Sequence, residues 1–250
     1  MDNFNNKVAL ITGGSRGIGA SVALTLASKG CNIALNYNSN LESATKLYNE
    51  LIKYNVKVFM VKANVSIISE IDKMFISVLN EFKKIDILIN SAGVSQIVDY
   101  DKITEDDWDN VMNINLKGTF FCCQRALKTM KEQKSGSIVN LASTAGQMGG
   151  FIVGVNYSAS KAGVICLTKS LSKSAIKYGV NVNCVAPGLI STDMTEEYPD
   201  NIVSDMKKTI PIGRLGTPQE VADGIVFLAS SEASYITGTT LYINGGTYLG

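Results

Sequence analysis

The sequence predicts an α/β fold in which about seven parallel strands form one doubly wound sheet with helices on both faces. Two observations predict it. Short runs of apolar, often β-branched residues alternate with longer helical stretches along the whole chain. These runs also lack the strict alternation of apolar and polar residues that marks a half-exposed strand, so both faces of the sheet are expected to be covered. Parallel strands joined by helices imply right-handed crossovers.

Seven segments are predicted to be strands: Val8–Thr12, Asn32–Tyr37, Val56–Lys62, Ile85–Asn90, Ser137–Leu141, Asn181–Ala186 and Thr240–Ile243. Six longer segments are predicted to be helices: Ile18–Lys29, Leu41–Tyr54, Glu70–Phe82, Asp106–Gln133, Tyr157–Tyr178 and Pro218–Ser230. The start of the last helix is the best marked. Thr217 offers an N-cap, Pro218 suits the first helical position and Glu220 completes a capping box.

No linker, repeat or low-complexity segment interrupts this order, so residues 1–250 are predicted to form one domain. The longest irregular stretch is the segment 188–216, which carries acids at Asp193, Glu196 and Glu197. Because it follows a predicted strand end, we interpret it as a mobile lid over a site. The alternative is a surface connection with a short helix of its own.

Charge and hydropathy argue against several classes of protein. The formal net charge is +1 without a long run of either sign, which gives no argument for nucleic acid or an anionic membrane as a partner. A strand is predicted within the first few residues, which leaves no room for a signal peptide. No apolar run reaches the ~18 residues of a membrane span. A cytoplasmic globular protein is predicted.

The cysteines are odd in number and show no Cys-x-x-Cys spacing; they are Cys31, Cys122, Cys123, Cys166 and Cys184. They are predicted to be buried reduced thiols rather than metal ligands or a redox pair, and no metal site is predicted. The sequence has no histidine, so proton transfer would have to use another residue type.

A glycine-rich turn, Thr12–Gly19, follows the first predicted strand and opens the first helix. Glycines let the backbone turn sharply and approach a pyrophosphate, which the amino terminus of the helix attracts. The spacing Gly-x-x-x-Gly-x-Gly differs from the commoner dinucleotide fingerprint, and the turn lacks the Gly-Lys-Ser/Thr ending of an ATP-binding loop. At the first strand–helix junction of an alternating chain, this turn predicts a dinucleotide site.

The end of the second predicted strand bears on the choice between NAD(H) and NADP(H). An acidic residue there would bind the ribose 2′-hydroxyl and repel a 2′-phosphate. The chain has the neutral run Asn36–Ser39 instead, and Arg16 in the glycine turn offers a guanidinium that can pair with a phosphate. These residues favour NADP(H). The alternative for Arg16 is an exposed charge without a ligand.

Tyr157 and Lys161 are four residues apart, which places the phenol and the ammonium on the same face of the predicted helix. A free tyrosine has a pKa of about 10 and is a poor acid at neutral pH, but a nearby cation lowers that pKa. Alone, such a pair is more often a solvated helix face. Other polar or small residues near strand ends make chemistry the better interpretation. They are Asn90–Gly93, Asn115, Ser143 and Pro187–Thr192.

Over essentially its whole length the chain resembles the short-chain dehydrogenases/reductases. The motifs that carry the resemblance are Thr12–Gly19, Asn90–Gly93, Ser143, Tyr157-x-x-x-Lys161 and Pro187–Thr192. Within that family the chain is most similar to the 3-oxoacyl-acyl-carrier-protein reductases, on the stretches 36–37, 213–216, 227–230, 235–238 and 244–246. The resemblance implies a Rossmann-type fold, a nicotinamide cofactor and a homotetramer built through the long helices and the carboxyl-terminal strand region.

The resemblance also implies roles for the site residues. Tyr157 would give its proton to the carbonyl oxygen of the substrate, and Lys161 would lower the tyrosine pKa and bind the nicotinamide ribose. Ser143 would hydrogen-bond the substrate oxygen and stabilise its developing charge. Asn115 would hold a water that links the lysine to solvent.

For the cofactor, the resemblance implies contacts along the carboxyl edge of the sheet. Gly13, Ser15, Arg16 and Ile18 would hold the pyrophosphate side, Asn38 and Ser39 would face the 2′-phosphate, Asn64 and Val65 would flank the adenine, and Ile190 and Thr192 would meet the carboxamide end. The predicted cofactor-binding set is completed by Gly17, Gly19, Asn90, Ala92, Gly93, Tyr157, Lys161, Pro187 and Gly188.

Three positions depart from the family's pattern. Ser91 stands where many relatives have asparagine, which costs no catalytic role. Asn64 stands where many have an acid, but it can still accept a hydrogen bond from an adenine amine. The segment between Ser143 and Tyr157 is one residue longer than in typical acyl-carrier-protein reductases and more apolar around Phe151–Val153. Because this segment borders the substrate pocket, substrate identity is open.

Acyl carrier proteins are acidic, and their reductases carry basic residues near the site entrance. The candidates here are Lys128, Lys131, Lys134, Lys173 and Lys177. Tyr178, however, stands where these reductases often have arginine. A solvated, lysine-rich helix surface explains the five lysines equally well.

Three hypotheses for function follow. The leading one is NADPH-dependent reduction of a 3-oxoacyl thioester, carried by acyl carrier protein, to the 3-hydroxyacyl form in fatty acid synthesis. The second is a ketoreductase for a free small alcohol, sugar or hydroxysteroid, which the apolar Phe151–Val153 stretch keeps open. The third is a non-catalytic NADP-binding sensor, against which the intact set of Ser143, Tyr157 and Lys161 argues.

Overall fold

The centre of the molecule is a seven-stranded parallel sheet with the strand order β3-β2-β1-β4-β5-β6-β7. The structure, a computed structural model, describes residues 4–150, 153–192, 195 and 200–250. The strands are β1 (Val8–Thr12), β2 (Asn32–Tyr37), β3 (Val58–Lys62), β4 (Ile87–Asn90), β5 (Gly136–Leu141), β6 (Val180–Pro187) and β7 (Thr240–Ile243). The predicted α/β fold class is confirmed.

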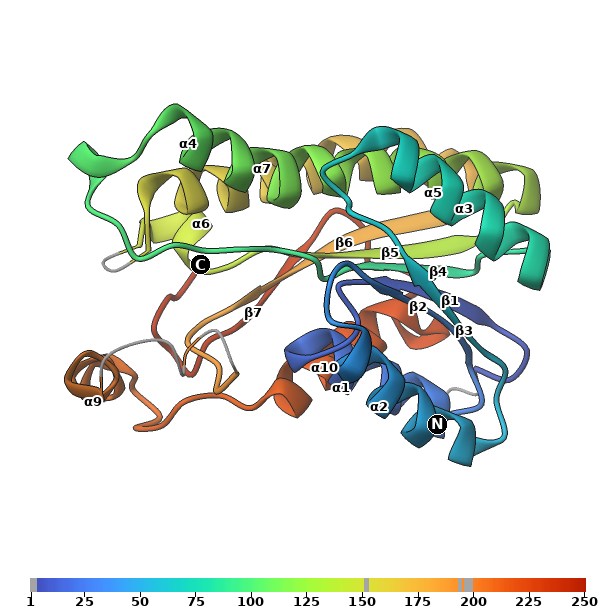
Figure 1. The fold of residues 1–250 in the computed structure, drawn as a ribbon, viewed down its shortest axis with the longest axis horizontal. Coiled ribbons are helices and arrows are strands. Elements are labelled where there is room, and N and C mark those ends of the chain that lie inside the picture. Colours follow the sequence, from blue (N-terminus) through green and yellow to red (C-terminus); the bar gives the residue numbers. More distant parts are fainter. Residues whose placement is uncertain (1–3, 151–152, 193–194, 196–199) are drawn as a thin grey trace.

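Helices cover both faces of this sheet (Figure 1). One face carries α1 (Gly17–Ser28), α2 (Leu41–Leu51) and α10 (Pro218–Ala229), and the other carries α3 (Ile68–Phe82), α5 (Thr119–Gln133) and α7 (Val155–Ala175). Each layer has its own apolar core. Successive residues of β1 alternate between the two cores: Ala9 and Ile11 pack with α1 and α10, whereas Leu10 packs with α3 and α5.

Local sequence signals set several element boundaries. The side chain of Thr217 accepts a hydrogen bond from the Glu220 N–H and Pro218 is the first residue of α10, which confirms the predicted capping box. β4 begins two residues later than predicted. The backbone N–H of Ile85 donates to the side chain of Gln133 (3.2 Å) instead of joining the sheet.

The predicted helix Asp106–Gln133 is wrong as one continuous element. The structure has α4 (Glu105–Met112), a π-helical turn (η3, Asn113–Gly118) and then α5. The side chain of Asn115 explains the break, because it bonds both the N–H and the carbonyl of Val94 at 2.9 Å. A side chain that bonds a neighbouring segment can interrupt the regular helical hydrogen bonds, and a π-bulge accommodates this. Such bulges are frequent at functional sites.

The segment 188–216 contains a helix, α9 (Asp200–Thr209), as the surface-connection alternative allows. A parallel bridge between Ile190 and Gly216 ties its ends together, and the Ile212 N–H donates to the Gly245 carbonyl (3.2 Å). The acids Asp193, Glu196 and Glu197 lie outside the described residues.

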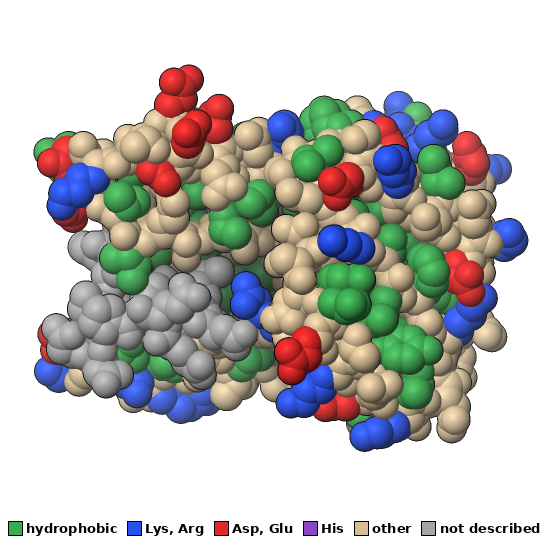
Figure 2. All heavy atoms as spheres, in the orientation of Figure 1, with side chains coloured by type: hydrophobic (Ala, Val, Ile, Leu, Met, Phe, Trp, Pro, Cys, Tyr) green, Lys and Arg blue, Asp and Glu red, His purple; other side chains and the backbone are tan. Residues whose placement is uncertain are grey.

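The remaining short elements are α6 (Ala145–Met148) and the 3-10 turns η1 (Ile52–Tyr54), η2 (Tyr100–Lys102), η4 (Ile176–Tyr178) and η5 (Ser231–Ala233). Among the helices that the structure describes, none is long and apolar enough to cross a membrane. Figure 2 shows Lys and Arg side chains interspersed with Asp and Glu on the face it presents, in keeping with the near-neutral net charge.

The predicted burial of the cysteines is confirmed at four of the five positions. All five thiols are free, and four are buried, but Cys166 is exposed because it lies on the outward side of α7, between the buried Ile165 and Thr168. Burial raises the pKa of the Cys31 and Cys123 thiols to about 12, so both remain protonated at neutral pH.

Candidate active site

The predicted site residues gather at the carboxyl ends of the strands, where the strand order reverses between β1 and β4. In Figure 1 this edge faces the side on which α6 and the carboxyl terminus lie. Thr12 joins the two strand ends: its hydroxyl accepts a hydrogen bond from the Ala92 N–H (3.3 Å) and donates to the Ile89 carbonyl (3.5 Å). A crevice of this kind is where open α/β sheets bind their ligands.

The glycine turn lies directly against the end of β4. Gly13 has a φ of +60°, and a Cβ built on it would be 2.7 Å from the Cα of Ala92, so a larger residue fits neither the conformation nor the space. The turn delivers the chain to α1, whose first turn carries no acidic residue. The N–H groups that begin a helix have no partner within it and attract an anion. This cradle fits the pyrophosphate of a dinucleotide.

The adenosine side of the candidate site is polar and carries no acid at the strand end. Asn38 and Ser39 follow β2 and are exposed, as is Arg16 at the N-cap of α1. Asn64 follows β3, but its side-chain oxygen already accepts hydrogen bonds from the backbone and hydroxyl of Ser66 (3.0 and 2.9 Å). An adenine amine would share that oxygen with Ser66.

Tyr157 and Lys161 both belong to the first two turns of α7. The Lys161 ammonium lies 5.6 Å from the centre of the Tyr157 ring and donates a hydrogen bond to the Leu141 carbonyl at the end of β5 (2.8 Å). The lysine is 4% exposed, and this burial lowers its pKa to about 8. It stays mostly protonated at neutral pH, so a cation faces the phenol.

Ser143 lies two residues after the end of β5, whose last carbonyl, that of Leu141, bonds Lys161. Its hydroxyl oxygen accepts a hydrogen bond from the Ala145 N–H (3.1 Å), which starts α6. The short helix lies against α7 in backbone contact, since a Cβ on Gly146 would be 2.6 Å from the carbonyl carbon of Lys161. The turn after Ser143 and the helix that carries Tyr157 and Lys161 are therefore packed together, although Tyr157 lies 14 positions after Ser143 in the sequence.

Asn115 connects this helix to the end of β4. Besides Val94, its side-chain amide bonds the hydroxyl of Ser160 (3.1 Å), which in turn donates to the Tyr157 carbonyl (2.7 Å). A Cβ on Gly93 would lie 3.3 Å from the Asn115 oxygen and 3.4 Å from the Lys161 nitrogen. The π-helical turn η3, the end of β4 and the helix α7 therefore meet beside Lys161.

Some predicted site residues are buried beneath the site and do not expose their side chains at the edge of the sheet. The Asn90 side chain is buried in the sheet and donates to Asn140 (2.8 Å) and the Cys123 sulfur (3.2 Å), so only its backbone faces the edge. Val65 and Ile190 are each 6% exposed. Thr192, by contrast, approaches the glycine turn, since a Cβ on Gly17 would be 3.6 Å from its methyl group.

The sequence reasoning missed two contributors. Asn156, fully buried just before Tyr157, accepts a bond from the Tyr157 N–H (2.9 Å) and donates to the Asp107 carbonyl (3.2 Å), which docks α7 on α4. The Gln147 side chain on α6 donates to the Tyr242 hydroxyl (2.8 Å) on β7. No local pattern signals a contact between residues so far apart. The predicted substrate-side residues Phe151 and Ile152 lie outside the described residues.

Comparison with known proteins agrees with this geometry. The sequence model of a family described as enoyl-(acyl carrier protein) reductase matches residues 13–248. With the parallel sheet and the strand-end site, this match shows that the chain belongs to the short-chain dehydrogenase/reductase family. It is an oxidoreductase that uses a nicotinamide cofactor and acts on a CH–OH/C=O pair.

Relatives within that family bear a more particular name. A 3-oxoacyl-(acyl-carrier-protein) reductase of Staphylococcus aureus is 42% identical over 243 residues, which cover 97% of this chain and 98% of the relative. Reductases of the same name from Synechocystis and Aquifex aeolicus are 42% identical over 247 and 246 residues, with 98% of both chains covered in each case.

The buried ammonium predicts a pH dependence of stability. The pKa of Lys161 is about 8 in the folded protein and 10.5 for a solvent-exposed lysine, as in the unfolded chain. Between these pH values the unfolded chain therefore binds more protons than the folded one. The free energy of unfolding is therefore expected to rise with pH between about 8 and 10.5. Below pH 8 the buried lysine is charged and lowers the stability by its full burial penalty. Lys161→Met should remove this rise.

Urea unfolding of the cofactor-free protein across this pH range measures the effect. Lys169→Met is the matched control, because Lys169 is an exposed lysine on the same helix and its removal should leave the rise intact. Parallel pH profiles for the wild type and Lys161→Met would contradict the prediction.

Proposed function

We propose that this protein reduces a 3-oxoacyl thioester carried by acyl carrier protein to the 3-hydroxyacyl form in fatty acid synthesis, with NADPH supplying the hydride when bound. One observation carries the proposal. The Lys161 ammonium, the Tyr157 ring and the turn after Ser143 pack together near the glycine turn, in a chain 42% identical to several full-length reductases of that name.

Tyr157 is the proton donor in this mechanism. Each pKa unit corresponds to about 1.4 kcal/mol, so bringing a phenol from about 10 toward neutrality requires several kcal/mol. The Lys161 ammonium stabilises the phenolate because it faces the ring and is itself buried from bulk solvent. Its bond to the Leu141 carbonyl keeps it in that position. Tyr157 then gives its proton to the substrate oxygen as that oxygen gains charge.

Ser143 stabilises the same oxygen. Its own oxygen is engaged by the Ala145 N–H, which leaves the hydroxyl hydrogen to be donated outward. A donor held in advance where negative charge develops lowers the barrier without reorganising during the reaction.

We assign proton resupply to the backbone at Asn115. Both polar atoms of its side chain already bond Val94 or Ser160, so that side chain holds the site together. The carbonyl of Asn115 accepts a hydrogen bond from the Thr119 hydroxyl (2.7 Å), and a carbonyl oxygen has a second lone pair. In the π-helical turn that lone pair can hold a water linking Lys161 to solvent.

The choice of NADP(H) rests on charge at the adenosine end. The exposed Arg16 guanidinium offers a partner for a 2′-phosphate, and Asn38 and Ser39 add neutral hydrogen-bonding groups. A carboxylate at the end of β2 would favour NAD(H) instead, and the chain has none there.

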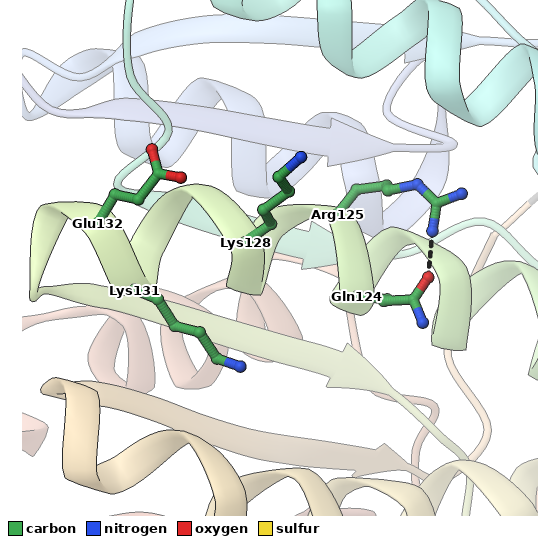
Figure 3. A pocket seen from close by; sticks show the side chains of 5 residues that line it. All are labelled: Gln124, Arg125, Lys128, Lys131 and Glu132. Carbon is green, nitrogen blue, oxygen red and sulfur yellow. Dashed lines mark hydrogen bonds between the residues drawn. The ribbon is translucent and has the colours of Figure 1, made fainter.

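Docking of an acidic carrier protein is supported by lysines near the carboxyl-terminal end of α5 and in η4, the turn that follows α7. Lys131 and Lys177 lie over the ring of Tyr178, at 4.8 and 5.1 Å from its centre. Lys131 also lines a surface groove of about 580 Å³, together with Gln124, Arg125, Lys128 and one acid, Glu132 (Figure 3). This groove contains none of the site residues, so we propose it as part of a carrier-docking face, where complementary charge speeds association.

The segment 188–216 remains our proposed lid within a single domain of residues 1–250. Its support is the anchoring of both ends, through the Ile190–Gly216 bridge and the Ile212–Gly245 hydrogen bond. A segment held at its ends can move between them without disturbing the sheet.

A parallel assay of cofactor oxidation tests the function. The substrates are acetoacetyl thioesters on acyl carrier protein and on a short pantetheine analogue, an enoyl thioester, a steroid ketone and a sugar ketone, each with NADPH and NADH. The carrier-linked acetoacetyl thioester with NADPH should give the highest kcat/KM. Turnover of the enoyl thioester or a free ketone, with none of either acetoacetyl thioester, would sink the proposal.

Tyr157→Phe removes only the hydroxyl from the proposed proton donor. The turnover number should fall by about 10² to 10⁴-fold, the usual contribution of a general acid, while the Kd for NADPH changes little. Tyr54→Phe makes the same substitution at an exposed side chain on η1, which precedes β3 at the end of the sheet away from the site, and should be silent. Unchanged turnover in Tyr157→Phe would show that another group donates the proton.

We also propose that the protein is a homotetramer. β7 is an edge strand whose four residues are only partly buried, and exposed strand edges are usually covered. The large side chains of Phe227 and Tyr235 are exposed, by 40% and 103%. Sedimentation at micromolar concentration should give four times the mass of the chain, and a monomer at that concentration would contradict the proposal.

A further inference from the structure

A buried asparagine at the end of β2, Asn36, is bonded to the glycine turn. Its side chain is 2% exposed, so it cannot be one of the surface groups that face solvent or a 2′-phosphate. Its side-chain oxygen accepts the N–H of Gly13 at 3.2 Å, and its backbone carbonyl accepts the N–H of Gly14 at 2.9 Å. One residue thus holds two successive amides of the turn.

The amide nitrogen of the same side chain points to β3. It donates to the carbonyls of Val61 (3.2 Å) and Ala63 (3.1 Å), and also to that of Tyr37 (3.3 Å). Ala63 directly precedes Asn64 and Val65, the residues predicted to flank the adenine. The Asn36 side chain therefore joins the pyrophosphate side of the candidate site to the adenosine side.

The turn is held from the opposite direction as well. A Cβ on Gly13 would be 2.7 Å from the Cα of Ala92, so the end of β4 closes on the turn from the side away from β2. Gly13 sits between a backbone contact on one flank and the Asn36 oxygen on the other. Its positive φ, +60°, is a conformation that needs such fixing because glycine otherwise has many accessible alternatives.

The partners of this side chain require one group that accepts and another that donates, and asparagine has both. Aspartate would accept from Gly13 but has no hydrogen to offer the Val61 and Ala63 carbonyls, and leucine offers neither. Buried backbone groups that lose a partner are costly, so the side-chain chemistry is specified by its surroundings.

We propose that Asn36 is a positioning residue for dinucleotide binding, which fixes the glycine turn at Gly13 and couples it to the end of β3. This inference rests on the proposed NADP(H) site. Because Asn36 acts on the part of the site that holds the pyrophosphate, which NADPH and NADH share, its loss should weaken both cofactors by the same factor.

Asn36→Ala and Asn32→Ala form a matched pair for the test. Both residues lie on β2 and both use the side-chain oxygen to accept a backbone N–H, but Asn32 bonds Lys57 (2.8 Å) at the end of the strand away from the site. Fluorescence titration with NADPH and with NADH should show both Kd values rising at least about tenfold in Asn36→Ala. They should rise less than about twofold in Asn32→Ala.

Residue-resolved hydrogen exchange of the cofactor-free wild type gives a second readout that needs no variant. The Gly13 amide should exchange as slowly as the Gly14 amide, because both are bonded to Asn36. In Asn36→Ala, exchange at Gly13 should accelerate by at least about tenfold while Gly14 is less affected. If that variant does not fold, fast exchange at Gly13 in the wild type overturns the inference and slow exchange supports it.

Three results in the variants would overturn the inference. Unchanged Kd values would show that the turn does not depend on Asn36, and equal losses in the two variants would show a general effect of weakening β2. A loss confined to NADPH would indicate a 2′-phosphate contact instead. The titrations use no acyl substrate, so they remain informative if the protein fails to reduce a 3-oxoacyl thioester.

Discussion

The arrangement of this site depends on a lysine ammonium buried against the end of a strand. Lys161 is 4% exposed, and its pKa is about 8 because burial disfavours the charged form. The salt bridges among the described residues do not include it, and its bonded partner is the neutral carbonyl of Leu141. Because no carboxylate in the described part of the chain neutralises this ammonium, its positive charge acts on the neighbouring phenol, where it favours the ionised form.

That ammonium is placed by close backbone packing. Gly93 lies beside it, Gly146 allows α6 to contact the Lys161 backbone in α7, and Gly13 allows the glycine turn to contact Ala92 after β4. Buried asparagine side chains form hydrogen bonds around these contacts. Asn115 and Asn156 bond residues of α7, and Asn36 bonds the glycine turn. These buried polar groups bond neighbouring elements, so they hold the strand ends and helix starts of this edge together.

Sequence patterns predicted the sheet well because each strand is a compact apolar run, and β1, β2 and β7 match the structure to the residue. They failed where a distant side chain intervenes. Asn115 bonds Val94 and breaks the predicted long helix with a π-helical turn. The Asn90 side chain is turned into the sheet toward Asn140, although the motif alone places it at the site. Periodicity carries no information about such partners.

By itself the sequence determined the order of the strands and helices, the glycine turn after β1 and the pairing of Tyr157 with Lys161, because each depends on spacing within a few residues. Only the tertiary structure decided how Lys161 is held, that Gln147 reaches Tyr242, and that the Asn36 side chain bonds the glycine turn. The physical reason is that these contacts join segments brought together by the packing of the sheet, whose partners are set by three-dimensional proximity and not by chain spacing.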